Sequence, residues 1–203
     1  MSFSSFSNFG YQQKKTFPIV IPTVSNGNFA SYAIQSDSGG GDGYVYIYGS
    51  TSTSPDALTL NDTLLPSWVV STPSGTNIIM STSGASPFYP TDTTYQNSNV
   101  LSVNFASGRS NISSTLSQNV NLAVGTRTLS FYASGQKLNK SANFTVSLGQ
   151  TTLTSPIRVS STNFTLYTYT YEATSSGTYP LVFTFINQTI NYNTMNITNV
   201  KIT

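Results

Sequence analysis

An alternation of threonine and tyrosine between residues 164 and 171, FTLYTYTY, most constrains the fold of this chain. Successive side chains of a β-strand point to opposite faces, so Tyr167, Tyr169 and Tyr171 are expected on one face and threonines on the other. A similar apolar stripe follows one turn later, at Leu181, Phe183 and Phe185. For these two aromatic stripes, packing in the core is favoured over a surface that stacks on sugars. The segments therefore predict two aromatic strands that line one hydrophobic core.

Short β-type runs separated by turns recur along the rest of the chain. They predict strands at residues 17–22, 44–48, 68–70, 77–80, 100–105, 116–122, 126–133, 144–148, 157–159, 163–172, 179–186 and 195–202. Turn signals such as Val124-Gly125 and Ser176-Gly177 separate the runs at spacings typical of antiparallel sheets. No window shows a helical period. The sequence therefore predicts an all-β fold, an antiparallel β-sandwich.

The first residues differ from the rest. A chain of 203 residues favours one large domain, so we expect an extended N-terminal arm at residues 1–16 and a sandwich domain at residues 17–203. The arm is either disordered alone or docks its phenylalanines, Phe3, Phe6 and Phe9, on a neighbouring subunit. It lacks the charged start and apolar run of a secretory signal, so the chain is expected to stay inside the cell until assembly, unless a signal has been removed.

Composition argues against catalysis and against several partners. Charged side chains make up 7% of the chain, and neither histidine nor cysteine occurs. These two residues usually supply the groups that titrate near neutrality and the soft metal ligands, so we predict that the protein is not an enzyme. A glycosidase pair would need Glu172 and an aspartate, and nothing in the sequence brings them together. A net charge of +2 without a basic stripe predicts no nucleic-acid partner, and the apolar runs are too short for a membrane span.

Six spaced fragments follow one another in the order of a known family. They are VSNGNF at 24–29, LPSWVV at 65–70, LSQNV at 116–120 with GTRTLSF at 125–131, FTLYTYTY at 164–171, GTYPLVF at 177–183 and ITNVKI at 197–202. Between residues 24 and 202 the chain thus resembles galactose-binding-like jelly rolls, which include carbohydrate-binding modules attached to xylanases and plant cell-wall proteins. The resemblance implies a jelly-roll β-sandwich in which Trp68 is a buried anchor.

The chain departs from that family at two positions that matter for metal binding. Many of its modules hold a structural calcium with a glutamate of the opening motif and an aspartate of the closing motif, and this chain has Ala30 and Thr198 there. Calcium prefers several hard oxygen ligands, usually some of them acidic, so we expect no metal site and no cofactor. Asp37 and Asp42, beside glycine turns, are interpreted as part of a surface loop because their spacing does not match a calcium loop.

Tyrosines supply the candidate binding surface. Tyr44, Tyr46 and Tyr48 are expected on one strand face, and Tyr89 and Tyr95 lie in turn-rich sequence. An aromatic ring with a polar tip suits both the CH faces of sugars and protein interfaces. Core packing, a protein interface and a glycan platform all stay open for these residues.

Two functions are compatible with these features. The leading hypothesis is a non-enzymatic structural protein of a virion, a minor capsid, vertex or surface component of a large icosahedral DNA virus. Its motivation is an initiator methionine without a signal, the aromatic arm, low charge, abundant threonine and asparagine, and the jelly-roll pattern. Its partners would be other capsid or virion proteins in a homo- or hetero-oligomer. The alternative is a carbohydrate-binding module or lectin-like host-attachment domain that binds glycans and is secreted or held at the cell surface.

Overall fold

The computed structural model describes residues 24–30, 32, 40–41, 44–49, 58–60, 65–72, 76–81, 99–105, 111–135, 143–159, 161–187 and 193–203. These residues form fourteen strands in two antiparallel sheets, and the predicted all-β sandwich is confirmed. No helix within these ranges is long and apolar enough to cross a membrane. The strand expected at 17–22, the arm at 1–16 and the boundary between arm and domain lie outside the described residues.

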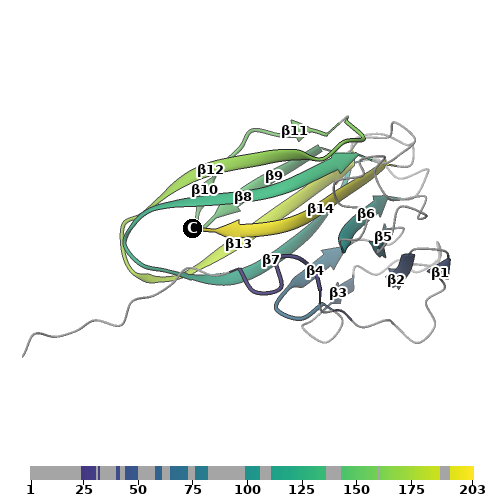
Figure 1. Ribbon diagram of the computed structural model, residues 1–203, viewed down its shortest axis with the longest axis horizontal. Coiled ribbons are helices and arrows are strands. Elements are labelled where there is room, and N and C mark those ends of the chain that lie inside the picture. The colour runs from purple at the N-terminus through teal and green to yellow at the C-terminus, as the bar shows by residue number, and fades with distance from the viewer. Residues whose placement is uncertain are drawn as a thin grey trace, which may run out of the picture.

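The two sheets lie face to face (Figure 1). Sheet A has the order β1 (Gly40–Gly41), β2 (Tyr44–Gly49), β5 (Thr76–Ser81), β6 (Val100–Phe105), β14 (Asn193–Ile202), β8 (Gly125–Gly135) and β12 (Thr165–Ala173). Sheet B has the order β10 (Thr151–Thr152), β9 (Asn143–Leu148), β13 (Gly177–Asn187), β7 (Ile112–Leu122), β4 (Val69–Thr72) and β3 (Leu58–Leu60), with β11 (Ile157–Arg158) also paired with β9.

The chain changes sheets twice at one end of the sandwich, on the left in Figure 1. The connection from β7 to β8 and the connection from β12 to β13 both pass from one sheet to the other. The tyrosine strand β12 and the phenylalanine strand β13 are therefore consecutive in sequence, but they lie in opposite sheets and are not hydrogen-bonded to each other. The prediction that both line one core is confirmed, because their stripes are packed in the same cluster.

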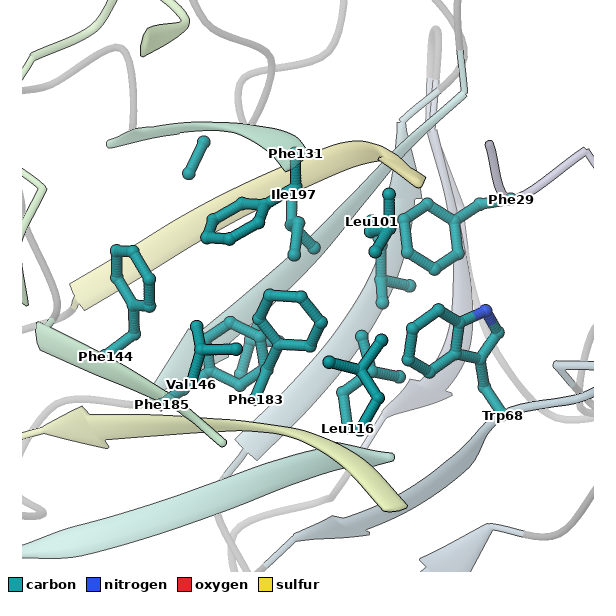
Figure 2. Close-up of a cluster of buried hydrophobic side chains, with 14 of the residues drawn as sticks. Phe29, Trp68, Leu101, Leu116, Phe131, Phe144, Val146, Phe183, Phe185 and Ile197 are labelled. Atoms are coloured by element: carbon teal, nitrogen blue, oxygen red, sulfur yellow. The ribbon is translucent and has the colours of Figure 1, made fainter. Parts of the chain in front are cut away.

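Aromatic rings from both sheets fill the interior (Figure 2). The ring of Phe131 lies between the sheets, with its centroid 5.5 Å from that of Tyr167 and 5.0 Å from that of Phe183. Phe183 and Phe185 are fully buried, while Tyr167 is half-buried because β12 is the outermost strand of its sheet. Burial of this much aromatic surface is the main force that holds the sheets together.

Candidate functional site

The opening turn of the described chain is locked to the last strand. The amide of Phe29 donates to the carbonyl of Asn26 over 3.0 Å, with φ of 54° and 48° at these residues. The amide of Val200 donates to the carbonyl of Gly27 over 2.9 Å. A Cβ on Gly27 would overlap the carbonyl oxygen of Val200, so only glycine fits there. Gly27 therefore allows the backbone of the opening turn to lie directly against the backbone of β14 at Val200.

Trp68 is a core anchor, as the family resemblance implied. It is fully buried, and its ring centroid lies 5.7 Å from that of Phe29 and 6.2 Å from that of Phe183. Its indole Nε1 donates to the carbonyl of Asn26 over 3.1 Å, which satisfies the polar end of the ring. Figure 2 shows Trp68 and Phe29 side by side at one end of the cluster. A buried ring with a satisfied donor is not available to stack on a sugar.

Neutral side chains connect the two positions where the resembled family has calcium ligands. The hydroxyl of Thr198 donates to the carbonyl of Asn99 over 2.9 Å, and the amide Nδ2 of Asn99 donates to the carbonyl of Phe29 over 3.1 Å. Asn28 accepts a bond from the amide of Ala30 over 3.3 Å. Within the described ranges no three acidic, histidine or cysteine side chains gather to hold a metal, and Asp37 and Asp42 lie outside those ranges.

The predicted tyrosine surface is described only in part. The backbone of β2 pairs with β5, and the register places Tyr46 opposite Ile79 and Tyr48 opposite Ile78, with an irregularity between the two tyrosines. The register shifts beside Ile47, and the expectation that Tyr44, Tyr46 and Tyr48 share one face stays a prediction. The side chains of these three tyrosines lie outside the described part of the chain, as do all atoms of Tyr89, Tyr95, Phe3, Phe6 and Phe9.

A surface that the sequence analysis missed lies on the outer face of sheet A. Leu166 of β12 is directly opposite Tyr132 of β8. Leu166 is 52% exposed, and Tyr132 is half-buried. The next two pairs on the same face, toward the end of β12, have hydroxyl side chains in both strands. We name this surface the Tyr132 face, and it consists of Tyr132, Leu166, Ser130, Thr168, Thr128 and Thr170.

The borders of the Tyr132 face differ from its centre. On one side the exposed carboxylate of Glu172 accepts a 2.6 Å bond from the hydroxyl of Thr126. Lys201 of β14 is exposed and lies opposite Ser130. Farther along β14, Thr198 lies opposite Tyr132 and is buried, so the exposed surface ends at Tyr132. The surface is therefore a neutral centre with one acidic and one basic group at its margin.

Next to the Tyr132 face, the outer side of sheet A is buried, and Asn196 is the centre of a hydrogen-bond network there. Its Oδ1 accepts a 2.6 Å bond from the hydroxyl of Ser102, and its Nδ2 donates to Ser134 over 3.2 Å and to the carbonyl of Gly135 over 3.1 Å. All of these groups are buried, so each bond compensates the loss of water. The network joins β6, β14 and β8 directly beside the strand pair that presents Tyr132.

The Tyr132 face carries groups that can contact a ligand. It combines an aromatic ring, an aliphatic side chain and several hydroxyl donors and acceptors. Glu172 is the one carboxylate side chain among the described residues, since all five aspartates lie outside them. A glycosidase pair therefore stays untested. If Phe131 points into the core, the alternation of a strand places Tyr132 on the outer face. Its pairing with Leu166 depends on strand register, which no local pattern reveals.

The comparisons with known proteins give distant fold neighbours. No protein-family model and no curated protein sequence matches the chain. Among solved structures, TmCBM61 in complex with beta-1,4-galactotriose has a TM-score of 0.49 and 13% identity, over 67% of this chain and 87% of that chain. The CBM22-1 xylan-binding domain from Paenibacillus barcinonensis Xyn10C has a TM-score of 0.45 and 10% identity, over 76% of this chain and 96% of its own. A family 35 carbohydrate binding module from Clostridium thermocellum has a TM-score of 0.41 and 12% identity, over 74% and 98%. At these values the likeness is one of β-sandwich architecture, and no ligand or residue role is transferred to this chain.

Proposed function

We propose that this protein is a non-catalytic carbohydrate-binding β-sandwich that binds sugar on the Tyr132 face. The observation that supports the proposal is the pair of Tyr132 and exposed Leu166, set directly opposite each other and continued by two pairs of hydroxyl side chains. The CH face of a pyranose packs on aromatic and aliphatic groups, and its hydroxyls exchange hydrogen bonds with serine and threonine. A strongly apolar ligand would leave these hydroxyls without a hydrogen-bond partner, and an ionic ligand would meet no opposite charge at the neutral centre of the face.

The composition of the face also limits the affinity. One aromatic contact contributes about 0.5–1.5 kcal/mol, and each net hydrogen bond contributes a similar amount. One ring and a few hydroxyls together supply about 4 kcal/mol, which corresponds to a dissociation constant of about 1 mM. Binding should therefore be detectable mainly with densely displayed or polymeric glycans, where several sites engage at once.

A glycan array of high density, probed with wild type and single-residue variants, tests the proposal. We expect wild type to bind at least one glycan class, Tyr132→Ala to lose the signal, and Tyr132→Phe to keep most of it because the ring remains. The matched control is Val182→Ala, since Val182 is a half-buried residue on the outer face of sheet B and should not affect binding. Each variant should unfold at a temperature close to that of wild type, measured before the array.

The outcomes separate the site from the function. If no glycan binds to wild type, the proposed function is wrong. If Tyr132→Ala binds as wild type does and Tyr46→Ala does not, sugar binding stands but its site is on β2. Reproducible turnover of any bound glycan, lost on Glu172→Gln, would contradict the non-catalytic part of the proposal.

A structural component of a virion is the second candidate function. The feature that favours it is the long outer edge of β12, a surface on which a further strand can add. If the full chain never associates with itself or with any component of a particle, this candidate loses its support. A secreted or cell-surface location goes with the sugar-binding function, and a virion location goes with the structural one.

A further inference from the structure

One sheet edge of the sandwich differs from the others in length. β12 is the last strand of sheet A and has 9 residues, whereas β1 at the other end of that sheet has 2. In sheet B the outer strands β3, β10 and β11 have 3, 2 and 2 residues. Very short edge strands are a common protection against pairing with another chain. Among the described strands, β12 is therefore the one long edge.

The backbone groups at this edge can be identified from the pairing of β8. Thr128 exchanges two hydrogen bonds with Thr203, of 2.8 and 3.0 Å, so its N–H and C=O point toward the β14 side. Groups alternate along an antiparallel strand, so Leu129 and Phe131 point toward β12, where they are opposite Tyr169 and Tyr167. The outward N–H and C=O groups of β12 consequently belong to Leu166, Thr168, Thr170 and Glu172.

Among the described residues, this edge has few of the features that usually protect a sheet edge. The register of β12 with β8 runs over the whole strand without a bulge. The strand contains no proline and no lysine, and its inward side chains are tyrosines. Its one charged residue, Glu172, is exposed and lies next to the end of the strand. Of the devices that usually block strand addition, β12 lacks proline, lysine, a bulge and an inward charge, and it has one exposed charge, Glu172, near its end.

We propose that two copies of this chain pair edge to edge through β12, antiparallel, about a two-fold axis at Tyr169. This register overlaps all 9 residues of the strand and places Thr168 of one copy opposite Thr170 of the other. Leu166 of each copy lies opposite Glu172 of the other, so the two carboxylates are at opposite ends of the interface. Every outward N–H then meets an outward C=O, because each outward residue is opposite an outward residue.

Self-pairing fits the sequence of β12 better than the addition of an unrelated strand does. Threonine meets threonine on the outer face and tyrosine meets tyrosine on the inner face, and both are favourable cross-strand pairs. Pairing of two β12 edges also uses up both edges, so the assembly closes as a dimer and does not grow into a fibre. The proposal does not depend on sugar binding.

Sedimentation of the full chain tests the dimer with a matched pair of variants. Thr168→Pro removes an outward N–H without removing a bond to β8, and proline is tolerated at such edge positions. Thr168→Ala removes the same side chain and keeps the N–H. We expect a concentration-dependent dimer for wild type and Thr168→Ala. For Thr168→Pro, which loses a donor twice by symmetry, we expect a dissociation constant raised at least about tenfold.

Three results would overturn the proposal. The first is a wild type that stays monomeric up to about 100 micromolar. The second is a folded Thr168→Pro protein that dimerises as Thr168→Ala does. The third is a dimer that survives Thr168→Pro but disappears when Phe3, Phe6 and Phe9 are replaced by serine in the full chain, since the arm would then be the contact.

Hydrogen exchange on wild type gives an answer even if Thr168→Pro does not fold. The amides of Leu166, Thr168, Thr170 and Glu172 should become more protected as protein concentration rises, while amides of the short edge strand β3 should not change. Protection that is independent of concentration at all four positions would contradict the interface.

Discussion

The amide of Val200 donates a 2.9 Å hydrogen bond to the carbonyl of Gly27, and this bond joins the first described turn to the last strand. Asn199, with φ of 57°, lies within the irregularity between Thr198 and Lys201 where β14 departs from regular pairing with β8. The departure leaves the amide of Val200 free to reach the turn and not the neighbouring strand. The opening and closing motifs of the sequence therefore act as one structural unit.

Replacing Gly27 should damage this unit. Gly27→Ala places a Cβ against the carbonyl oxygen of Val200, and both backbones are fixed by their mutual hydrogen bond. We expect a loss of at least about 2 kcal/mol in the free energy of unfolding, measured by urea titration. Gly177→Ala is the matched control, because the nearest atom to its new Cβ is 4.0 Å away, and it should be close to neutral. Equal stability of the two variants would show that the turn is not locked as described.

The side chain of Gln118 should contribute to the free energy of unfolding, because it holds the backbone of Ser25 with two hydrogen bonds. Its Oε1 accepts from the amide of Ser25 over 3.0 Å and its Nε2 donates to the carbonyl of the same residue over 3.1 Å. Gln118→Leu keeps the volume but removes both hydrogen bonds to the Ser25 backbone in a partly buried place, at a cost of about 1–2 kcal/mol in the free energy of unfolding. The neighbouring exposed residue gives the control, Asn119→Ala, with an expected change below about 0.5 kcal/mol.

Calcium should not stabilise the protein. Thr198 and Asn99 fill the region near the opening turn with neutral hydrogen bonds, where the resembled family has carboxylates. A bound ion at one hundred times its dissociation constant would add about 2.7 kcal/mol and raise the melting temperature by about 5–11 °C. We expect the same melting temperature in excess calcium and in EDTA, by differential scanning calorimetry. A rise of that size with calcium would show a metal site that sequence reasoning missed.

Alkaline pH should destabilise the fold through the half-buried tyrosines of β12. Burial raises the pKa of Tyr167 and of Tyr169 above the ordinary value of 10.0. The unfolded chain then releases these protons at lower pH than the folded chain, so this contribution to stability is complete below pH 10 and is lost as pH rises through the folded pKa. Tyr167→Phe keeps the ring beside Phe131 but removes one such group.

Urea midpoints at pH 8 and pH 11 measure this effect. The fall in stability between the two pH values should be smaller for Tyr167→Phe than for wild type, with the pH 8 values as the internal reference. An identical fall in both proteins would mean that the hydroxyl of Tyr167 is as well solvated in the folded state as in the unfolded chain.

Much of the fold could be predicted from the sequence because alternation is a local signal. The long strands β7, β8, β9, β12, β13 and β14 were all predicted, with ends within a few residues of those observed. The strands β1, β3 and β10 were missed, since two or three residues are too few to show a period. The register shift between Tyr46 and Tyr48 was missed because it leaves no mark on the local composition.

The candidate site was less predictable. The sequence directed attention to the tyrosines of β2 because three of them occur at alternate positions. Tyr132 is a single tyrosine after Phe131, and it becomes a candidate only when the register places it beside Leu166 at the limit of the open surface. A binding surface on a sheet is composed across strands, and cross-strand neighbours are far apart in sequence.

The sequence by itself determined that the aromatic stripes of β12 and β13 face the core and that few side chains are available for acid–base chemistry. These properties follow from alternation, hydrophobicity and residue type, which are local. Only the tertiary structure decided that β12 and β13 lie in opposite sheets, that Leu166 meets Tyr132, and that β12 is the last of the described strands in its sheet. Those relationships arise from strand order and register, which depend on contacts between distant segments and have no local signature.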